Sequence, residues 1–104
     1  MFGVLFLCMF IINLNYIGPL AKIDARMKEH MAFLNACYRE GLFLVSGRKI
    51  PRTGGIIVAR GSSKEAVEAL MNNDPFVSER LAEFTIIEFQ ASQSHPDLKK
   101  LLEG

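Results

Sequence analysis

The sequence predicts an α+β domain whose strands and helices follow the order β-α-β-β-α-β. Apolar stretches of strand length recur along the chain, two segments carry apolar residues at steps of three or four, and breaks containing Gly or Pro separate them. This order is typical of the ferredoxin-like arrangement, an antiparallel sheet with both helices on one face. The length of 104 residues suits one domain with a modest core.

The first strand is predicted over residues 9–16, and the first helix follows between Pro19 and Gly41. Glycine and then proline after the strand suit the start of a helix. Gly41 is predicted to end the helix in a left-handed conformation. The helix has an apolar side formed by Ile23, Met27, Met31, Leu34, Cys37 and Tyr38.

Residues 1–8 are predicted to be an N-terminal extension of a domain that covers residues 9–104. The apolar run over residues 1–12 is too short to span a bilayer as a helix. It also lacks the basic start and the small-residue cleavage site of a secretory signal. Residues 1–8 either extend the first strand or precede a natural start at Met9, and we expect no membrane partner.

Two further strands, residues 42–47 and 56–60, are expected to pair as a hairpin across the turn-rich link 48–55. The second helix is predicted to open at Gly61-Ser62. Ser62 and Glu65 have the spacing of a capping box, in which each side chain reaches the backbone amide of the other residue.

A short helical piece is predicted to begin at Pro75, with Asp74 as its N-cap, and to reach about Leu81. The fourth strand then covers residues 84–89. A last helix over residues 98–103 is expected to be capped by the segment His95-Pro96-Asp97.

The sheet face opposite the helices is predicted to be apolar. The fourth strand reads FTIIEF and the third reads IIVA, so both are apolar on both sides. A strand with one face in solvent instead alternates apolar and polar residues. We therefore expect a symmetric homodimer in which this open face packs on the same face of a second copy. The alternative is that the N-terminal extension and the C-terminal tail cover it.

The charge balance and the cysteine content argue against several classes of partner and site. The 12 basic and 11 acidic side chains give a formal charge of +1, and no basic block is present, so nucleic acid is not an expected partner. Cys8 and Cys37 form no CxxC motif and no His/Cys cluster, so neither a disulfide framework nor a metal site is indicated. We expect a cytoplasmic protein without a metal or another cofactor.

His30 lies on the apolar side of the first helix, three residues after Met27 and four before Leu34. A buried polar ring without a partner costs about a few kcal/mol. The residues alone allow two interpretations: a core histidine satisfied by a backbone carbonyl, or a functional acid–base group.

Five short motifs follow one another along residues 9–102. They are Glu29-His30-x-x-Phe33-Leu34, Glu40-Gly41-x-Phe43-Leu44-x-Ser46-Gly47, Pro51-Arg52-Thr53-Gly54-Gly55, Asp74-Pro75-Phe76 and Glu88-Phe89. In this order and spacing they resemble the YciI-like proteins, the YCII-related domain family. The resemblance implies a dimeric α/β-barrel fold related to muconolactone isomerase. It also implies an active-site pair of His30 and Asp74, and a dehydrochlorinase of a chlorinated hydroxyhydroquinone is a precedent for its chemistry.

A His–Asp pair would have a clear chemical use. A carboxylate that accepts the N–H of one ring nitrogen fixes the tautomer, so the other nitrogen is free to take or give a proton near neutral pH. Asp74 also suits a purely structural N-cap. The two roles are compatible, because one carboxylate oxygen can cap while the other faces His30.

The sequence predicts a ligand pocket between the first helix and the sheet. Its predicted substrate-binding residues are Ser46, Gly47, Arg52, Gly54, Phe33 and Phe76. Its aromatic lining is Phe33, Phe43 and Phe76. Amides exposed by glycines, with an arginine nearby, suit an anionic oxygen; the alternative is a hairpin loop whose glycines permit positive φ. Arg48 stands where the family often has proline, which changes the rim of the pocket.

We therefore expect a small enzyme that uses His30 and Asp74 for lyase or isomerase chemistry on a quinol- or lactone-like substrate. The alternative is a non-catalytic dimer that binds a metabolite or serves as an accessory module. Tyr16 is predicted at the edge of the core, with the mouth of the pocket as the other position. His95 is predicted to cap a helix or face solvent, and Cys37 to be a small core residue.

Overall fold

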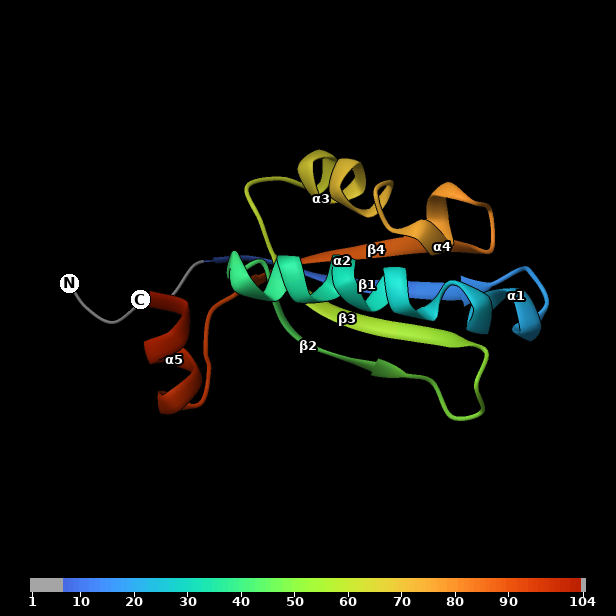
Figure 1. Cartoon of the computed structure of the whole chain (residues 1–104). Helices are drawn as coiled ribbons and strands as arrows, with labels where there is room; N and C mark the ends of the chain where they lie inside the picture. The colour runs from blue at the N-terminus through green and yellow to red at the C-terminus, as the bar shows by residue number, and fades with distance from the viewer. Residues whose placement is uncertain (1–6, 104) are drawn as a thin grey trace.

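Four antiparallel strands form one sheet in the order β2-β3-β1-β4 (Figure 1). The structure is a computed structural model, and it describes residues 7–103 of the chain. The strands are β1 (Leu7–Tyr16), β2 (Phe43–Arg48), β3 (Gly54–Arg60) and β4 (Ala82–Ala91). β1 pairs with β3 on one side and with β4 on the other. The predicted α+β ferredoxin-like arrangement is confirmed.

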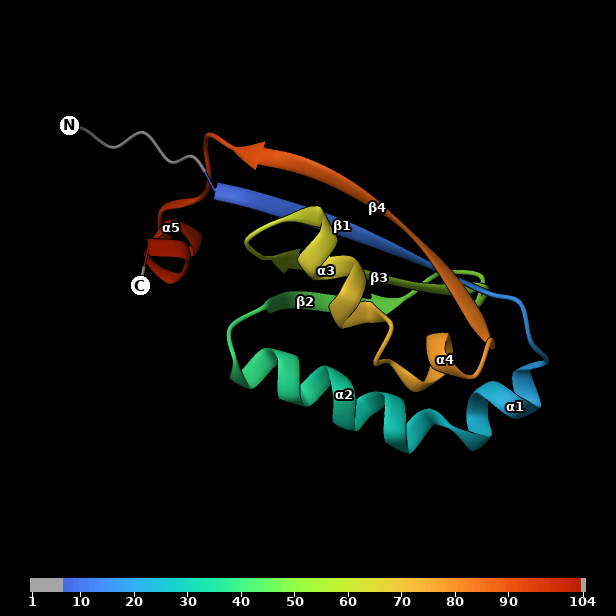
Figure 2. The same ribbon diagram turned by 90° about the horizontal axis from the view of Figure 1, so that it is seen from above.

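Four helices lie over one face of this sheet: α1 (Leu20–Ala25), α2 (Met27–Arg39), α3 (Lys64–Met71) and α4 (Pro75–Ser78). A fifth helix, α5 (Pro96–Glu103), lies apart from them at the end of the sheet where β1 begins and β4 ends (Figures 1 and 2). Of the predicted N-terminal extension, residues 1–6 lie outside the described residues, and Leu7 and Cys8 belong to β1.

The core forms because alternate residues of β1 point toward the helices. Phe10 and Ile12 are fully buried and Leu14 is 3 % exposed. They pack in one cluster with the buried side chains of all four covering helices: Ile23, Leu34, Cys37, Val67, Met71 and Phe76. This cluster fixes α2 and α4 against the sheet, and these are the two elements that supply the candidate pair.

The predicted long first helix is in fact two helices, because the chain leaves helical geometry at Arg26 (φ −109°, ψ 8°). The Arg26 N–H donates to the Ile23 carbonyl, three residues earlier instead of four. Its guanidinium is held by Glu79, with 2.7 Å between Nε and Oε2. No Gly or Pro lies at this break, and the apolar residues keep their helical spacing across it. The sequence pattern therefore predicted one continuous helix.

Two helix boundaries also differ from the sequence prediction. The N-cap of α3 is Ser63, whose hydroxyl accepts from the Ala66 N–H at 3.0 Å, so the predicted capping box at Ser62 is one residue too early. α4 ends at Ser78, short of Leu81, because Arg80 takes a positive φ of 59° and turns the chain into β4.

Two glycines are required by the backbone itself. Gly41 has a φ of 74°, as the predicted left-handed cap requires. Gly54 stands where β3 passes close to β1, and a Cβ there would collide with the carbonyl oxygen of Leu14. Glycine at position 54 therefore permits the strand contact beside the candidate site.

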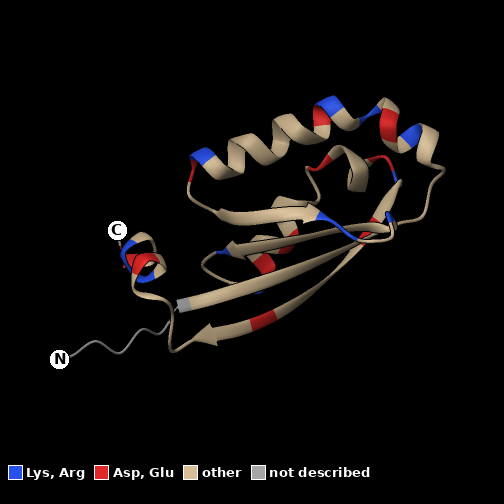
Figure 3. Cartoon of the chain, turned by 90° about the horizontal axis from the view of Figure 1, so that it is seen from below, with Lys and Arg blue, Asp and Glu red and all other residues tan. Residues whose placement is uncertain are grey.

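The sheet face turned away from α1–α4 is mostly apolar and largely uncovered, although Asn13 and Thr85 also lie on it. We call it the open face: Ile11, Val45, Ile56, Val58, Ile87 and Phe89, which share this side through the strand register. Val45 and Ile87 are 57 % and 61 % exposed. In Figure 3, charged residues gather on the helices and at strand ends, and the strands carry few of them.

The C-terminal helix covers only one end of the open face. Leu102 of α5 packs on Met9 and Ala91, and Leu44 and Val58 border this small cluster. Among the described residues, the C-terminal tail thus covers only this end of the open face. None of the helices in residues 7–103 is long and apolar enough to cross a membrane.

Candidate active site

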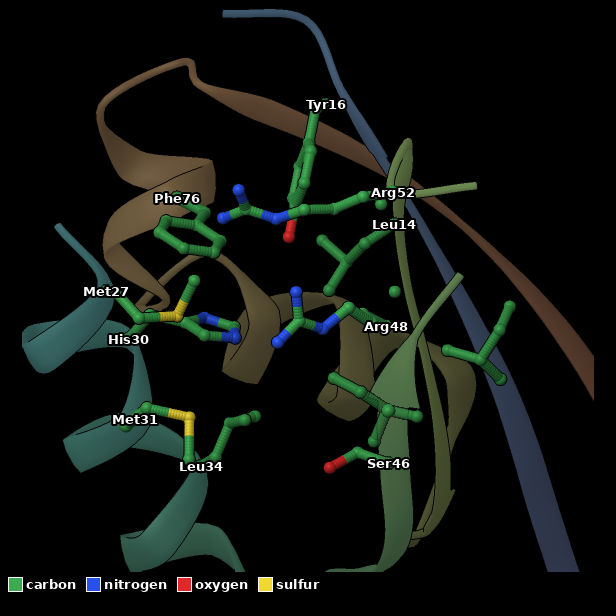
Figure 4. A pocket seen from close by; sticks show the side chains of 15 residues that line it. Leu14, Tyr16, Met27, His30, Met31, Leu34, Ser46, Arg48, Arg52 and Phe76 are labelled. Carbon is green, nitrogen blue, oxygen red and sulfur yellow. The ribbon is translucent and has the colours of Figure 1, made fainter. Parts of the chain in front are cut away.

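A cavity of about 230 Å³ lies between α2 and α4 on one side and the strands β1, β2 and β3 on the other (Figure 4). Its helix wall holds His30, Met27, Met31, Leu34 and Phe76. Its strand wall holds Leu14, Tyr16, Ser46, Gly47, Arg48, Arg52, Gly54, Gly55, Ile56 and Ile57. The cavity thus lies where the sequence predicted a pocket, between the first helical segment and the sheet.

His30 and Asp74 meet at the helix wall. His30 Nδ1 lies 2.8 Å from Asp74 Oδ1, although 44 positions separate the two residues in sequence. Asp74 is fully buried and His30 is 8 % exposed. An ionised carboxylate can only accept, so the contact then requires a proton on Nδ1. That leaves Nε2, the nitrogen on the cavity side of the ring, free to exchange a proton with a ligand.

Asp74 makes both contacts that the sequence allowed, a helix cap and a contact with the His30 ring. Its Oδ1 accepts the Phe76 N–H at 3.1 Å and thereby caps α4. The same oxygen contacts His30, so cap and pair share one atom instead of using one oxygen each. Oδ2 is buried and has no hydrogen-bond partner among the described residues. The carboxylate is therefore held in place from the backbone of α4.

Phe76 fixes the plane of the His30 ring. The two rings stack with centroids 4.0 Å apart and an interplanar angle of 6°. Tyr16 also contacts Phe76, in a T-shaped arrangement with ring centroids 5.9 Å apart. A side-chain hydrogen bond and a stacked ring together restrict both torsions of the histidine, which favours a defined direction for Nε2.

The strand wall is cationic. Arg48 and Arg52 point into the cavity, and the Tyr16 hydroxyl lies beside the Arg52 guanidinium (Figure 4). Arg52 forms an ion pair with Asp24 of α1. The hydrogen bond to Asp24 raises the pKa of Arg52, with a smaller contribution from Tyr16. In return, the Arg52 hydrogen bond lowers the pKa of Asp24, and Arg48 contributes to the same direction.

Two predicted aromatic lining residues do not reach the cavity. Phe43 is 2 % exposed in the core, and Phe33 packs edge-on against it with centroids 6.0 Å apart. Phe33 lies on a flank of α2 that faces Phe43, so its predicted place in the substrate-binding set is wrong. The other five members of that set line the cavity: Ser46, Gly47, Arg52, Gly54 and Phe76.

Tyr16, predicted at the core edge or the pocket mouth, packs against the core and also lines the cavity, and Arg48, predicted to change the pocket rim, lines the cavity from an exposed position. Both had a usable signal in strand periodicity. Tyr16 shares its strand face with Leu14, and Arg48 shares its face with Ser46, two positions earlier. The Ser46 hydroxyl already has a hydrogen-bond partner, because its Oγ lies 2.6 Å from the Tyr38 hydroxyl.

The remaining candidate groups take structural roles. Burial raises the pKa of Cys37 to about 11, so its thiol is neutral at physiological pH and is a poor nucleophile. His95 accepts the Asp97 N–H on Nδ1 at 3.1 Å and thus caps α5, as predicted. No group of three or more His, Cys, Asp or Glu side chains that would hold a metal ion occurs within residues 7–103.

The double role of Asp74 predicts the size of its contribution to stability. Asp74→Ala leaves the His30 ring and the Phe76 N–H without an acceptor in a buried place, which we expect to lower the free energy of unfolding by about 2–5 kcal/mol. Ser63→Ala removes an exposed cap alone and should cost only about 0.5–2 kcal/mol. Urea unfolding of both variants compares them. An Asp74→Ala loss no larger than that of Ser63→Ala would mean that the carboxylate only caps.

Comparison with known proteins agrees with this architecture. No curated protein matches the chain. Among solved structures, it resembles 5-chloro-2-hydroxyhydroquinone dehydrochlorinase from Burkholderia phenoliruptrix AC1100, in complex with 2,5-dihydroxybenzoquinone. The TM-score is 0.63 at 19 % identity, over 86 % of this chain and 97 % of the other, and at this identity the likeness concerns the fold. The model of the YCII-related domain matches residues 9–90, and the chain therefore belongs to the YCII-related domain family, the YciI-like proteins.

Proposed function

We propose that this protein is a metal-free acid–base enzyme of lyase or isomerase type that acts on a small quinol- or lactone-like ring. The observation that carries the proposal is the 2.8 Å contact between His30 Nδ1 and the buried Asp74, on a ring that borders a cavity. His30 is the general base and then the acid. Asp74 holds its tautomer and stabilises the imidazolium that forms.

The chemistry follows from these positions. Nε2 takes a proton from a carbon or hydroxyl adjacent to a ring carbonyl, and the electron pair moves into the ring. In a lyase reaction, this electron pair then expels a leaving group such as chloride. In an isomerisation, the imidazolium instead returns the proton to another carbon of the ring. Both outcomes need one proton carrier and no redox partner.

The dimensions of the cavity support a small substrate. Pockets for drug-sized ligands hold roughly 300–1,000 Å³, whereas this cavity holds about 230 Å³. Apolar side chains such as Leu14, Leu34 and Met31 suit the faces of a single ring, and the polar groups stand at two opposite walls. The structural neighbour acts on a chlorinated hydroxyhydroquinone, which is a molecule of this class.

Turnover of a small panel tests the proposal: chloride release from 5-chloro-2-hydroxyhydroquinone, isomerisation of muconolactone, and deuterium uptake from solvent at acidic carbons of both. We expect at least one reaction, and His30→Asn should slow it about a hundred- to ten-thousandfold. His95→Asn changes the other histidine, which caps α5, and should leave the rate unchanged.

The contrary result is saturable binding of 2,5-dihydroxybenzoquinone without turnover of any compound in the panel. That result would favour the second candidate function, a non-catalytic module that binds or carries a metabolite. The pre-formed cavity supports this alternative as well as catalysis, because a fold of this kind serves both.

The open face supports a homodimer as the working unit. An exposed apolar surface built from several neighbouring strands is unusual for a monomer. A second copy packed on the same surface would exclude water from Ile87 and Val45, which are the most exposed members of the open face. The free cysteines Cys8 and Cys37 are consistent with a cytoplasmic location, which we propose with the dimer.

Sedimentation velocity at micromolar concentration checks the dimer. The unchanged protein should sediment at twice the monomer mass, and Ile87→Glu should shift it to monomer, because the sheet interface cannot bury an unpaired charge. Ile50→Glu places the same charge on an apolar residue that is 97 % exposed outside the open face, and it should remain dimeric. A monomeric unchanged protein would refute this part of the proposal.

A further inference from the structure

We propose that the cavity selects a ring with an anionic oxygen, which belongs either to a carboxylate or to an ionised hydroxyl, and that Arg48 binds this oxygen. The inference rests on the proposed function only in placing the ligand in this cavity. It narrows the substrate from quinol- or lactone-like rings in general to ring acids.

The first step is the charge of the cavity lining. Arg48 and Arg52 both line it, and no aspartate or glutamate does so among the described residues. Asp74 lies behind the helix wall and is fully buried, without being part of the lining. A ligand in the cavity therefore meets positive charge and no carboxylate on the lining, which favours an anion over a neutral molecule.

The second step separates the two arginines. Arg52 already has a carboxylate, since Asp24 forms an ion pair with it from α1. Arg48 forms no ion pair and no side-chain hydrogen bond within residues 7–103, and its donors point into the cavity (Figure 4). Arg48 is therefore the cation that is available to a ligand. A planar guanidinium also matches a carboxylate through two parallel hydrogen bonds.

The third step is the arrangement of the two walls. His30 comes from α2 and Arg48 from β2, and in Figure 4 they point into the cavity from opposite sides. The apolar residues Leu14, Leu34 and Met31 line the cavity together with these two polar side chains. A ring seated there would turn its charged substituent to the strand wall and its acidic position to His30. Arg48 would thus set the orientation of the ring as well as its charge.

Calorimetric titration with two probes of matched shape tests the inference. The probes are 2,5-dihydroxybenzoate, which is an anion, and 2,5-dihydroxybenzamide, which is its neutral analogue. We expect the anion to bind the unchanged protein about tenfold more tightly at low ionic strength, and this ratio to shrink as salt is added. Arg48→Gln should bring the ratio close to one with little change in the affinity of the amide.

Two further variants separate a specific charge contact from a general effect. Arg48→Lys keeps the charge but loses the planar pair of donors, so it should retain part of the preference, between the unchanged protein and Arg48→Gln. Arg39→Gln removes an equal charge from the exposed C-terminal turn of α2, outside the cavity lining, and should leave the ratio unchanged. Circular dichroism of the variants confirms that each is folded.

Equal affinity of the unchanged protein for both probes would overturn the inference, and so would an Arg48→Gln variant that keeps the preference, or failure of both probes to bind at millimolar concentration. The experiment measures binding alone, so it stands apart from turnover. A preference that depends on Arg48 in a protein without turnover would sustain this inference and refute the proposed catalysis. Turnover that needs His30, in a protein that binds both probes equally, would sustain the proposed catalysis and refute this inference.

Discussion

The contact between His30 and Asp74 is the constraint on which the rest of the site depends. A buried carboxylate is costly unless hydrogen bonds compensate it, and Asp74 receives two such contacts on Oδ1, from the His30 ring and from the Phe76 N–H. One atom therefore ties the long helix α2 to the short helix α4. The same contacts orient the imidazole. The Phe76 N–H donates to Asp74, and the Phe76 ring stacks on the ring of His30. Fold stability and the direction of Nε2 thus depend on the same few atoms.

The two walls of the cavity divide the chemistry between helices and strands. The helix wall holds the His30 ring, and its partner Asp74 is fully buried, so a ligand in the cavity would meet the ring and apolar side chains but not the carboxylate. The strand wall presents Arg48 and Arg52, positioned by the alternation of β2 and by the loop that leads into β3. Gly54 lets that loop approach the backbone of β1 closely. The proposed base and the cationic surface lie on opposite sides of the cavity, an arrangement that suits a substrate that is both acidic and anionic.

Local rules predicted those parts of the structure that local forces decide. Aspartate before Pro-Phe gave the cap of α4, and alternation in β1 gave the buried face of the sheet. The break at Arg26 was not predictable, because it accompanies an ion pair with Glu79, 53 positions away, and no helix-breaking residue marks it. Phe33 was misplaced because an aromatic residue near His30 in sequence can still lie on another flank of the same helix. The pairing of His30 with Asp74 came from family resemblance, since periodicity alone allowed a solitary core histidine.

The tautomers of the two histidines test the central claim most directly. Two-bond ¹⁵N–¹H spectra of the uniformly labelled protein, recorded where both rings are neutral, report which ring nitrogen carries the proton. His30 should carry it on Nδ1, donated to Asp74, while His95 should carry it on Nε2, because its Nδ1 accepts the Asp97 N–H. His95 is thus the internal control. A neutral His30 ring with its proton on Nε2 would contradict the account, because the nitrogen that faces the cavity would then be unable to act as a base.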